Sequence, residues 1–149
     1  RSKEIRSTVS VMRDRSVEGW WQEMHLLLHG NKTADMDFVV LGGEDKGLQQ
    51  EKSYSAQALG FAFDGRIFIR RAGRIQTRIE RTNVTANRDA VYLPPEALNG
   101  YPLGTGIRSN TRLQYFVNRT ISITLSMNTI RDSRYKKLTT FLGEIRAHF

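Results

Sequence analysis

Alternation of apolar and polar residues is the feature that most constrains how this chain can fold. In TRLQYFVNRTISITLSM, residues 111–127, apolar side chains recur at odd positions, and the even positions from 120 to 126 are threonine or serine. A period of two is the spacing of a β-strand with one buried and one wet face. The segment predicts an antiparallel strand. Arg119 breaks the odd register and indicates a bulge or turn between two shorter strands.

A second alternating stretch is ALGFAFDGRIFIRR, residues 58–71. The Asp64-Gly65 pair between hydrophobic residues is typical of a two-residue hairpin turn. We expect Phe61 or Phe63, and Ile67 or Ile69, to be buried on either side of it. Shorter strands are predicted in STVSVM and DFVVL. Together these segments predict a mainly antiparallel sheet of five to seven strands that can curl toward a barrel.

Two segments have the spacing of helices, near residues 16–29 and 133–148. In the first, apolar residues recur at intervals of three and four, with Asp14 or Ser16 as a cap and Gly30 as an end. A strand from Trp20 through His29 is the competing interpretation. In the second, a stripe follows Asp132 or Ser133: Tyr135, Leu138, Phe141, Leu142, Ile145 and Phe149. The predicted fold class is therefore α+β, with strand exceeding helix and two helices flanking the sheet.

The 149 residues are predicted to form a single domain, 1–149, since this length suits one hydrophobic core. The first residue is Arg1, so the chain can be a trimmed or processed piece of a longer one. Without cysteine, neither a disulfide nor a thiolate metal site can form. No run approaches the ~18 apolar residues of a helical crossing, so we expect no membrane span. Nothing in the sequence indicates a compartment.

Positive charge is concentrated in the second half of the chain. The net charge is +8, and residues 66–134 contain twelve arginines against four acidic residues. Within GRIFIRRAGRIQTRIERT, isoleucines occupy odd positions and arginines mostly even ones. On one strand, the even arginines would share a face, with a glycine bulge at Ala72–Gly73. We expect the isoleucines to hold this strand to the core and the arginines to form its outer face.

A one-sided basic row with neighbouring aromatic residues favours a binding surface. The candidate partner- or polyanion-binding residues are Arg66, Phe68, Arg70, Arg74, Arg78 and Arg112. The leading hypothesis is a non-enzymatic assembly module, a structural subunit that docks on acidic surfaces of other protein subunits. An alternative is binding of RNA or single-stranded DNA, whose bases stack while phosphates pair with arginine. A small-ligand-binding β-barrel is a second alternative.

Other motifs do not favour catalysis. His25 and His29 lie four residues apart, but no glutamate of a metalloprotease motif stands between them. The glycines in FVVLGGEDKG lack the Gly-Lys-Ser/Thr of a phosphate loop and favour a tight hairpin or bulge. LPPEALNGYPLGTG, with all three prolines, predicts a long surface loop. We expect no enzyme, catalytic residue, metal or cofactor.

Overall fold

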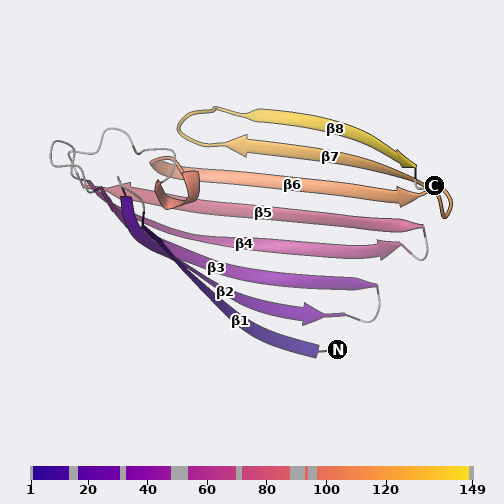
Figure 1. Cartoon of the computed structure of the whole chain (residues 1–149), viewed down its shortest axis with the longest axis horizontal. Coiled ribbons are helices and arrows are strands. Elements are labelled where there is room, and N and C mark those ends of the chain that lie inside the picture. The colour runs from indigo at the N-terminus through magenta and orange to yellow at the C-terminus, as the bar shows by residue number, and fades with distance from the viewer. Residues whose placement is uncertain are drawn as a thin grey trace.

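The chain forms one antiparallel sheet of eight strands in the order in which they occur in the sequence (Figure 1). The computed structural model describes residues 2–13, 17–30, 33–47, 54–69, 72–87, 93 and 97–147. The strands are β1 (Ser2–Arg13), β2 (Val17–His29), β3 (Ala34–Gly47), β4 (Ser55–Ile69), β5 (Gly73–Ala86), β6 (Gly104–Phe116), β7 (Ile121–Arg131) and β8 (Leu138–Ala147). The prediction that strand exceeds helix is confirmed. The sheet is open, because β1 and β8 are not paired with each other in the described strands.

The α+β prediction with two flanking helices is wrong. Most of residues 16–29 form β2, and much of 133–148 forms β8. Apolar residues on both faces of a strand can imitate helical spacing: Trp20 and Met24 lie on one face of β2, while Trp21 and Leu27 lie on the other. Backbone pairing along nearly the whole of β2 and β8 then decides the conformation.

The only helix in the described part of the chain is the 3-10 turn η1, Ala97–Gly100. Across these residues no helix has the length and apolar character needed to cross a membrane. The predicted surface loop at 93–106 therefore contains η1 and, from Gly104 onward, the start of β6.

Asp64 and Gly65 are not a hairpin turn, since both lie inside the uninterrupted strand β4. Asp64 pairs with Asp37 on β3 and Arg78 on β5, and the strand continues to Ile69. The alternating apolar residues before and after Asp64-Gly65 favour a continuous strand more strongly than the pair favours a turn. The chain instead reverses over residues 70–72, where the Ala72 amide donates to the Ile69 carbonyl at 2.8 Å.

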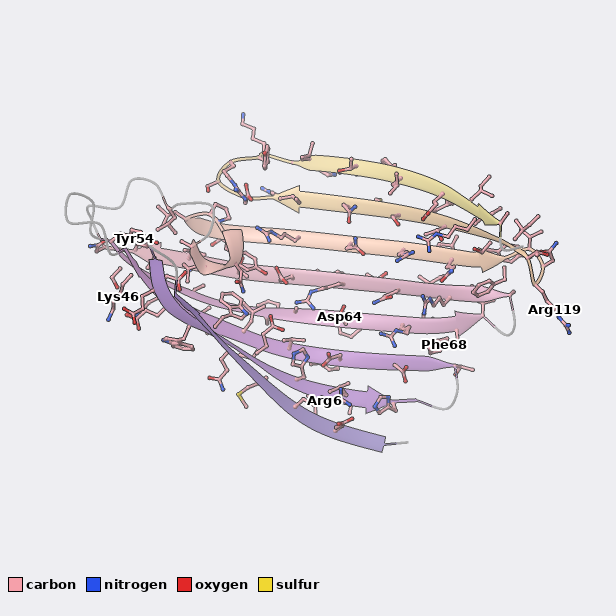
Figure 2. All side chains as sticks on the ribbon, viewed as in Figure 1. Arg6, Lys46, Tyr54, Asp64, Phe68 and Arg119 are labelled. Carbon is pink, nitrogen blue, oxygen red and sulfur yellow. The ribbon has the colours of Figure 1, made fainter. Side chains whose placement is uncertain are left out.

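The predicted interruption at Arg119 is confirmed as the turn between β6 and β7. Asn118 stabilises it, because its Oδ1 accepts hydrogen bonds from the amides of Thr120 at 2.8 Å and Ile121 at 2.7 Å. Arg119 itself projects from this turn (Figure 2).

The pairing register gives the sheet two chemically different faces. Directly opposed residues share a face, and one row runs through Arg6, His25, Val39, Ala62, Glu80, Arg108, Ile130 and Leu138. We call the face containing this row the polar face, because most charged strand residues lie on it. The other is the apolar face, and it includes Met36, Phe38, Val40, Phe61, Ile67, Ile69, Ile79, Ile107, Leu125 and Phe141.

Burial is inverted relative to the sequence prediction. On β7, Ser122 and Thr124 were predicted to face water but are only 2% and 4% exposed. Leu125, the next residue on the strand and on the opposite face, is 53% exposed. We expected Phe61 or Phe63, and Ile67 or Ile69, in the core, but Phe61, Ile67 and Ile69 are exposed and Phe63 is only half-buried. The isoleucines therefore do not hold the sheet to a core. The covered side is the polar face.

A cap covers part of the polar face. The connection from β5 to β6 carries η1 back over β2, β3 and β4, and Figure 1 shows it at one end of the sheet. We use "cap" for its described residues Leu93 and Ala97–Leu103. The buried cluster beneath and within it comprises Trp21, Val39, Leu41, Tyr54, Ala56, Ala58, Ala62, Val84, Leu93, Ala97, Leu98 and Tyr101.

The two ends of the sheet differ in their connections. At the end away from the cap the chain reverses over residues 30–33, 70–72 and 117–120, and we call it the short-turn end. At the cap end the connections are 14–16, 48–54, 87–103 and 132–137. Figure 1 shows both chain termini at the short-turn end.

Candidate functional site

The predicted basic residues do share one face, but they lie on three strands rather than one. Arg66 and Phe68 are on β4, Arg74 and Arg78 on β5, and Arg112 on β6. Arg70 lies outside the described residues, so its predicted place in the row has no structural outcome. Figure 2 shows Phe68 near the short-turn end of β4, with Asp64 farther along the strand.

Four of these arginines surround one glutamine. Gln76 on β5 is directly opposite Arg66 on β4 and Arg112 on β6. Arg74 and Arg78 stand two residues before and after Gln76 on the same strand, and therefore on the same face. We call Arg66, Arg74, Arg78 and Arg112 the arginine ring. Its diagonal neighbours are separated by roughly 7–8 Å between Cα atoms.

Arg78 is the neutralised member of the ring. Its Nη1 donates to Asp64 Oδ2 at 2.9 Å, and its Nη2 donates to Glu80 Oε2 at 3.0 Å. Burial raises the pKa of Asp64, and the nearby Arg78 charge partly offsets this rise. The Arg78–Asp64 pair links β5 to β4 across the polar face, whereas Arg78 and Glu80 both lie on β5.

The other three ring arginines form no ion pair among the described residues, although Asp35 on β3 is directly opposite Arg66 and the charge of Arg112 helps to lower the pKa of Glu144 on β8. Arg74 donates from Nε to Gln114 Oε1 at 3.0 Å, a neutral acceptor. The side chain of Arg66 forms neither an ion pair nor a hydrogen bond with any described residue. The Nε of Arg112 is buried without a hydrogen-bond partner there. The four arginines and the four acids around them, Asp35, Asp64, Glu80 and Glu144, have no net formal charge when all are ionised, but three of the four guanidinium groups form no ion pair.

The cap forms a second polar site that the sequence analysis did not find. The Tyr101 ring stacks on Trp21, with centroids 5.5 Å apart and planes at 8°. The guanidinium carbon of Arg108 also lies over the Tyr101 ring, 4.2 Å from its centroid. The Tyr101 hydroxyl donates to Glu80, so burial and this hydrogen bond raise the pKa of Tyr101. Glu80 therefore links the cap to Arg78 in the arginine ring.

Trp21 fits beneath the cap because Gly43 lies beside it. A Cβ at Gly43 would stand 2.6 Å from Trp21 Cε3 and 2.7 Å from the Trp20 carbonyl oxygen. The glycines of FVVLGGEDKG thus lie inside β3, where they leave room for an indole, and do not form the expected hairpin or bulge.

Asp45 anchors the turn of the cap. Its carboxylate accepts a hydrogen bond from the Leu98 amide, and Leu98 and Asn99 have left-handed φ values of 46° and 53°. Such angles are strained for residues other than glycine. Burial raises the pKa of Asp45, although the Leu98 hydrogen bond acts in the opposite direction.

The two histidines of the first half of the chain lie on the polar face and contact carboxylates. His25 Nδ1 is 2.8 Å from Asp37 Oδ2, and its Nε2 is 3.3 Å from Glu23 Oε2. His29 Nδ1 is 3.1 Å from Asp35 Oδ1. In the described ranges no group of three or more His, Cys, Asp or Glu side chains could hold a metal ion.

No described element covers the apolar face. Its side chains are exposed over most of the sheet: 57% for Val40, 58% for Phe61 and 75% for both Phe141 and Ile145. The exposed apolar residues form a band rather than a scatter. Toward the cap end the band gives way to charged and polar residues, beginning with the exposed Arg81 between Phe61 and Ile107 and including Glu44, Gln57, Asn83, Thr105 and Arg131. At the opposite end it stops at the turn that contains Asn118 and Arg119. A contiguous exposed patch of this kind marks an interaction surface.

No protein-family model, curated protein or solved structure matches this chain. The candidate sites therefore rest on geometry alone: the arginine ring, the cap and the apolar face. The sequence pattern predicted the ring residues but not the cap or the exposed apolar face. The alternation of apolar and polar residues along the strands does indicate two different faces. The prediction placed the apolar face inside and the polar face in water, which is the reverse of what the structure has.

Proposed function

We propose that this protein is a membrane-embedded sheet, with its apolar face against lipid acyl chains and its polar face toward a hydrated or protein-filled interior. The observation that carries this proposal is the inverted burial. Thr82, Ser122 and Thr124 are buried on the polar face, whereas most of the exposed leucines, isoleucines and phenylalanines lie on the other face. Water disfavours such an arrangement, whereas lipid stabilises it.

Strand length supports the proposal. A strand tilted by about 45° needs roughly 9–11 residues to cross the hydrocarbon layer. The strands contain from 10 residues in β8 to 15 residues in β4. The expectation of no membrane span rested on the absence of a run of ~18 apolar residues. That criterion applies to helices and does not detect strands in which apolar and polar residues alternate. An alternating strand presents only every second residue to lipid.

Aromatic side chains at the two ends of the band also support it. Trp20, 43% exposed, lies opposite Glu44 toward the cap end. Tyr115, 47% exposed, lies at the short-turn end of β6. Tryptophan and tyrosine are favoured where hydrocarbon meets headgroups, because their rings are amphipathic.

The proposal also constrains the two outer strands. Neither β1 nor β8 has a second neighbour among the described strands, and lipid provides no hydrogen bonds for a free backbone edge. Eight strands closed on themselves would leave an interior only wide enough for side chains, whereas the polar face already carries the cap. We therefore expect both edges to pair with further strands from outside these eight.

The competing occupant of the apolar face is another protein, as in the assembly-module hypothesis. That hypothesis placed docking on the arginine-rich side, which is the polar face here. Protein cover would have to match an apolar surface that extends over most of the sheet. Lipid meets this requirement without shape complementarity.

Reconstitution of the full chain tests the proposal. Protein purified in detergent is mixed with phosphatidylcholine, the detergent is removed, and the vesicles are floated on a density gradient. We expect the folded chain to float with the vesicles and to remain after an alkaline carbonate wash. Recovery as a folded, monodisperse protein or protein complex without lipid or detergent would contradict the proposal.

A further inference from the structure

The geometry points to an oxyanion-binding site at the arginine ring, one that takes a phosphate or carboxylate group on the polar face near the short-turn end. The inference is independent of what covers the apolar face. It requires only the ring residues Arg66, Arg74, Arg78 and Arg112 and the register that places them around Gln76.

Unpaired guanidinium groups are the first argument for this site. Four guanidinium groups surround one neutral side chain, and in the described structure only Arg78 forms ion pairs with carboxylates, although Asp35 lies opposite Arg66. The remaining guanidinium groups lie close enough to repel one another. An anion between the unpaired members would replace this repulsion with charge-assisted hydrogen bonds.

An unsatisfied donor is the second argument. The Nε of Arg112 is buried and has no partner among the described residues. Buried donors without partners are rare because they lose hydration without compensation. Arg66 and Arg74 are exposed, so their donors are accessible on the same face. Arginine suits this role because its planar fork matches the oxygens of phosphate and carboxylate.

The surroundings favour a compact anion over a nucleic acid strand. Glu80 stands directly beyond Arg78, and Asp64 lies opposite it, so the positive charge is bounded by acids toward the cap. Phe68 is opposite Arg74, but it is the one aromatic residue in direct register with the ring members. Single-stranded nucleic acid needs several stacking platforms along a basic groove.

Calorimetric titration with inorganic phosphate tests the site in the full, detergent-solubilised chain at constant ionic strength. We expect saturable binding that chloride does not reproduce. Arg66→Gln combined with Arg112→Gln should weaken it by about tenfold or more, because two charge-assisted contacts are lost. A parallel titration with citrate shows whether carboxylates share the site.

Arg6→Gln is the matched control. Arg6 also lies on the polar face, but it is on β1, away from the ring, and its Nε is 2.7 Å from Glu4 Oε1. This variant should bind phosphate as the unaltered chain does. Melting temperatures of all variants establish that they fold. If phosphate does not bind above the chloride background, or binds equally to the Arg66 and Arg112 variant, the site does not exist.

Discussion

The two faces of this sheet have the same backbone but opposite surroundings. On the polar face, Glu80 and Thr82 are buried at 6% and 3% exposure, and Arg78 pairs with Asp64 on the neighbouring strand. On the apolar face, Ile79 and Phe61 are largely exposed and contact no covering element. The difference shows that alternation predicts a strand but does not predict which of its sides is inside.

The largest expected difference between the faces concerns the two adjacent tryptophans. Trp21→Ala should destabilise the fold by about 3–5 kcal/mol, since a buried indole stacked on Tyr101 is removed. Trp20→Ala on the exposed face should change stability by only about 0.5 kcal/mol. Denaturant unfolding in detergent measures both. Equal losses would show that the faces do not differ in packing.

A charge placed on each face sharpens the comparison. Leu125→Arg puts a cation in the exposed apolar band, and we expect it to reduce vesicle insertion by about 2–4 kcal/mol if the site lies at the bilayer midplane. Asn128→Arg adds the same charge on the polar face of the same strand and should insert almost normally. The floated fraction of each variant, compared in one gradient, gives the answer. A stronger defect in Asn128→Arg would reverse the assignment of the faces.

A smaller effect is expected at Asp45, beneath the cap. Because burial raises its pKa, the folded state binds this proton more tightly than the unfolded chain does. The contribution of Asp45 to the free energy of unfolding is therefore greatest below the ordinary aspartate pKa. It is lost as the pH rises through the raised pKa of Asp45 in the folded state.

Asp45→Asn tests this account of Asp45. Its amide oxygen can still accept from Leu98, so we expect the variant to lose this pH dependence and to be at least as stable at neutral pH. Melting temperatures measured from pH 4 to pH 8 check the sign. A variant that is markedly less stable at neutral pH, with the pH slope retained, would show that Asp45 is not the responsible group.

Much of the strand content could be predicted from the sequence, but the surroundings of the strands could not. The period of two around Ile121 and Leu125 correctly indicated β7, and Arg119 marked the turn before it. The helical spacing in β2 misled because Trp20 and Trp21 serve opposite faces, each with its own apolar neighbours. Only the pairing with β1 and β3 resolves that ambiguity.

The arginine ring shows the same limit at the level of a site. Even positions placed Arg66, Arg74 and Arg78 on one face, which is correct, but the sequence did not reveal that the chain reverses between Arg66 and Arg74. That reversal brings the arginines into register around Gln76 and adds Arg112 from β6. The cap was missed because Tyr101 and Leu98 follow a proline-rich segment that resembles an exposed loop.

Fluorescence quenching by brominated lipids tests the central claim most directly, since the chain contains only two tryptophans and they point to opposite faces. Trp21→Phe retains Trp20 on the apolar face, and Trp20→Phe retains Trp21 beneath the cap. In vesicles with brominated acyl chains, we predict strong quenching of Trp20 and little quenching of Trp21. Equal quenching of both, or quenching of Trp21 alone, would contradict a sheet whose apolar face contacts lipid.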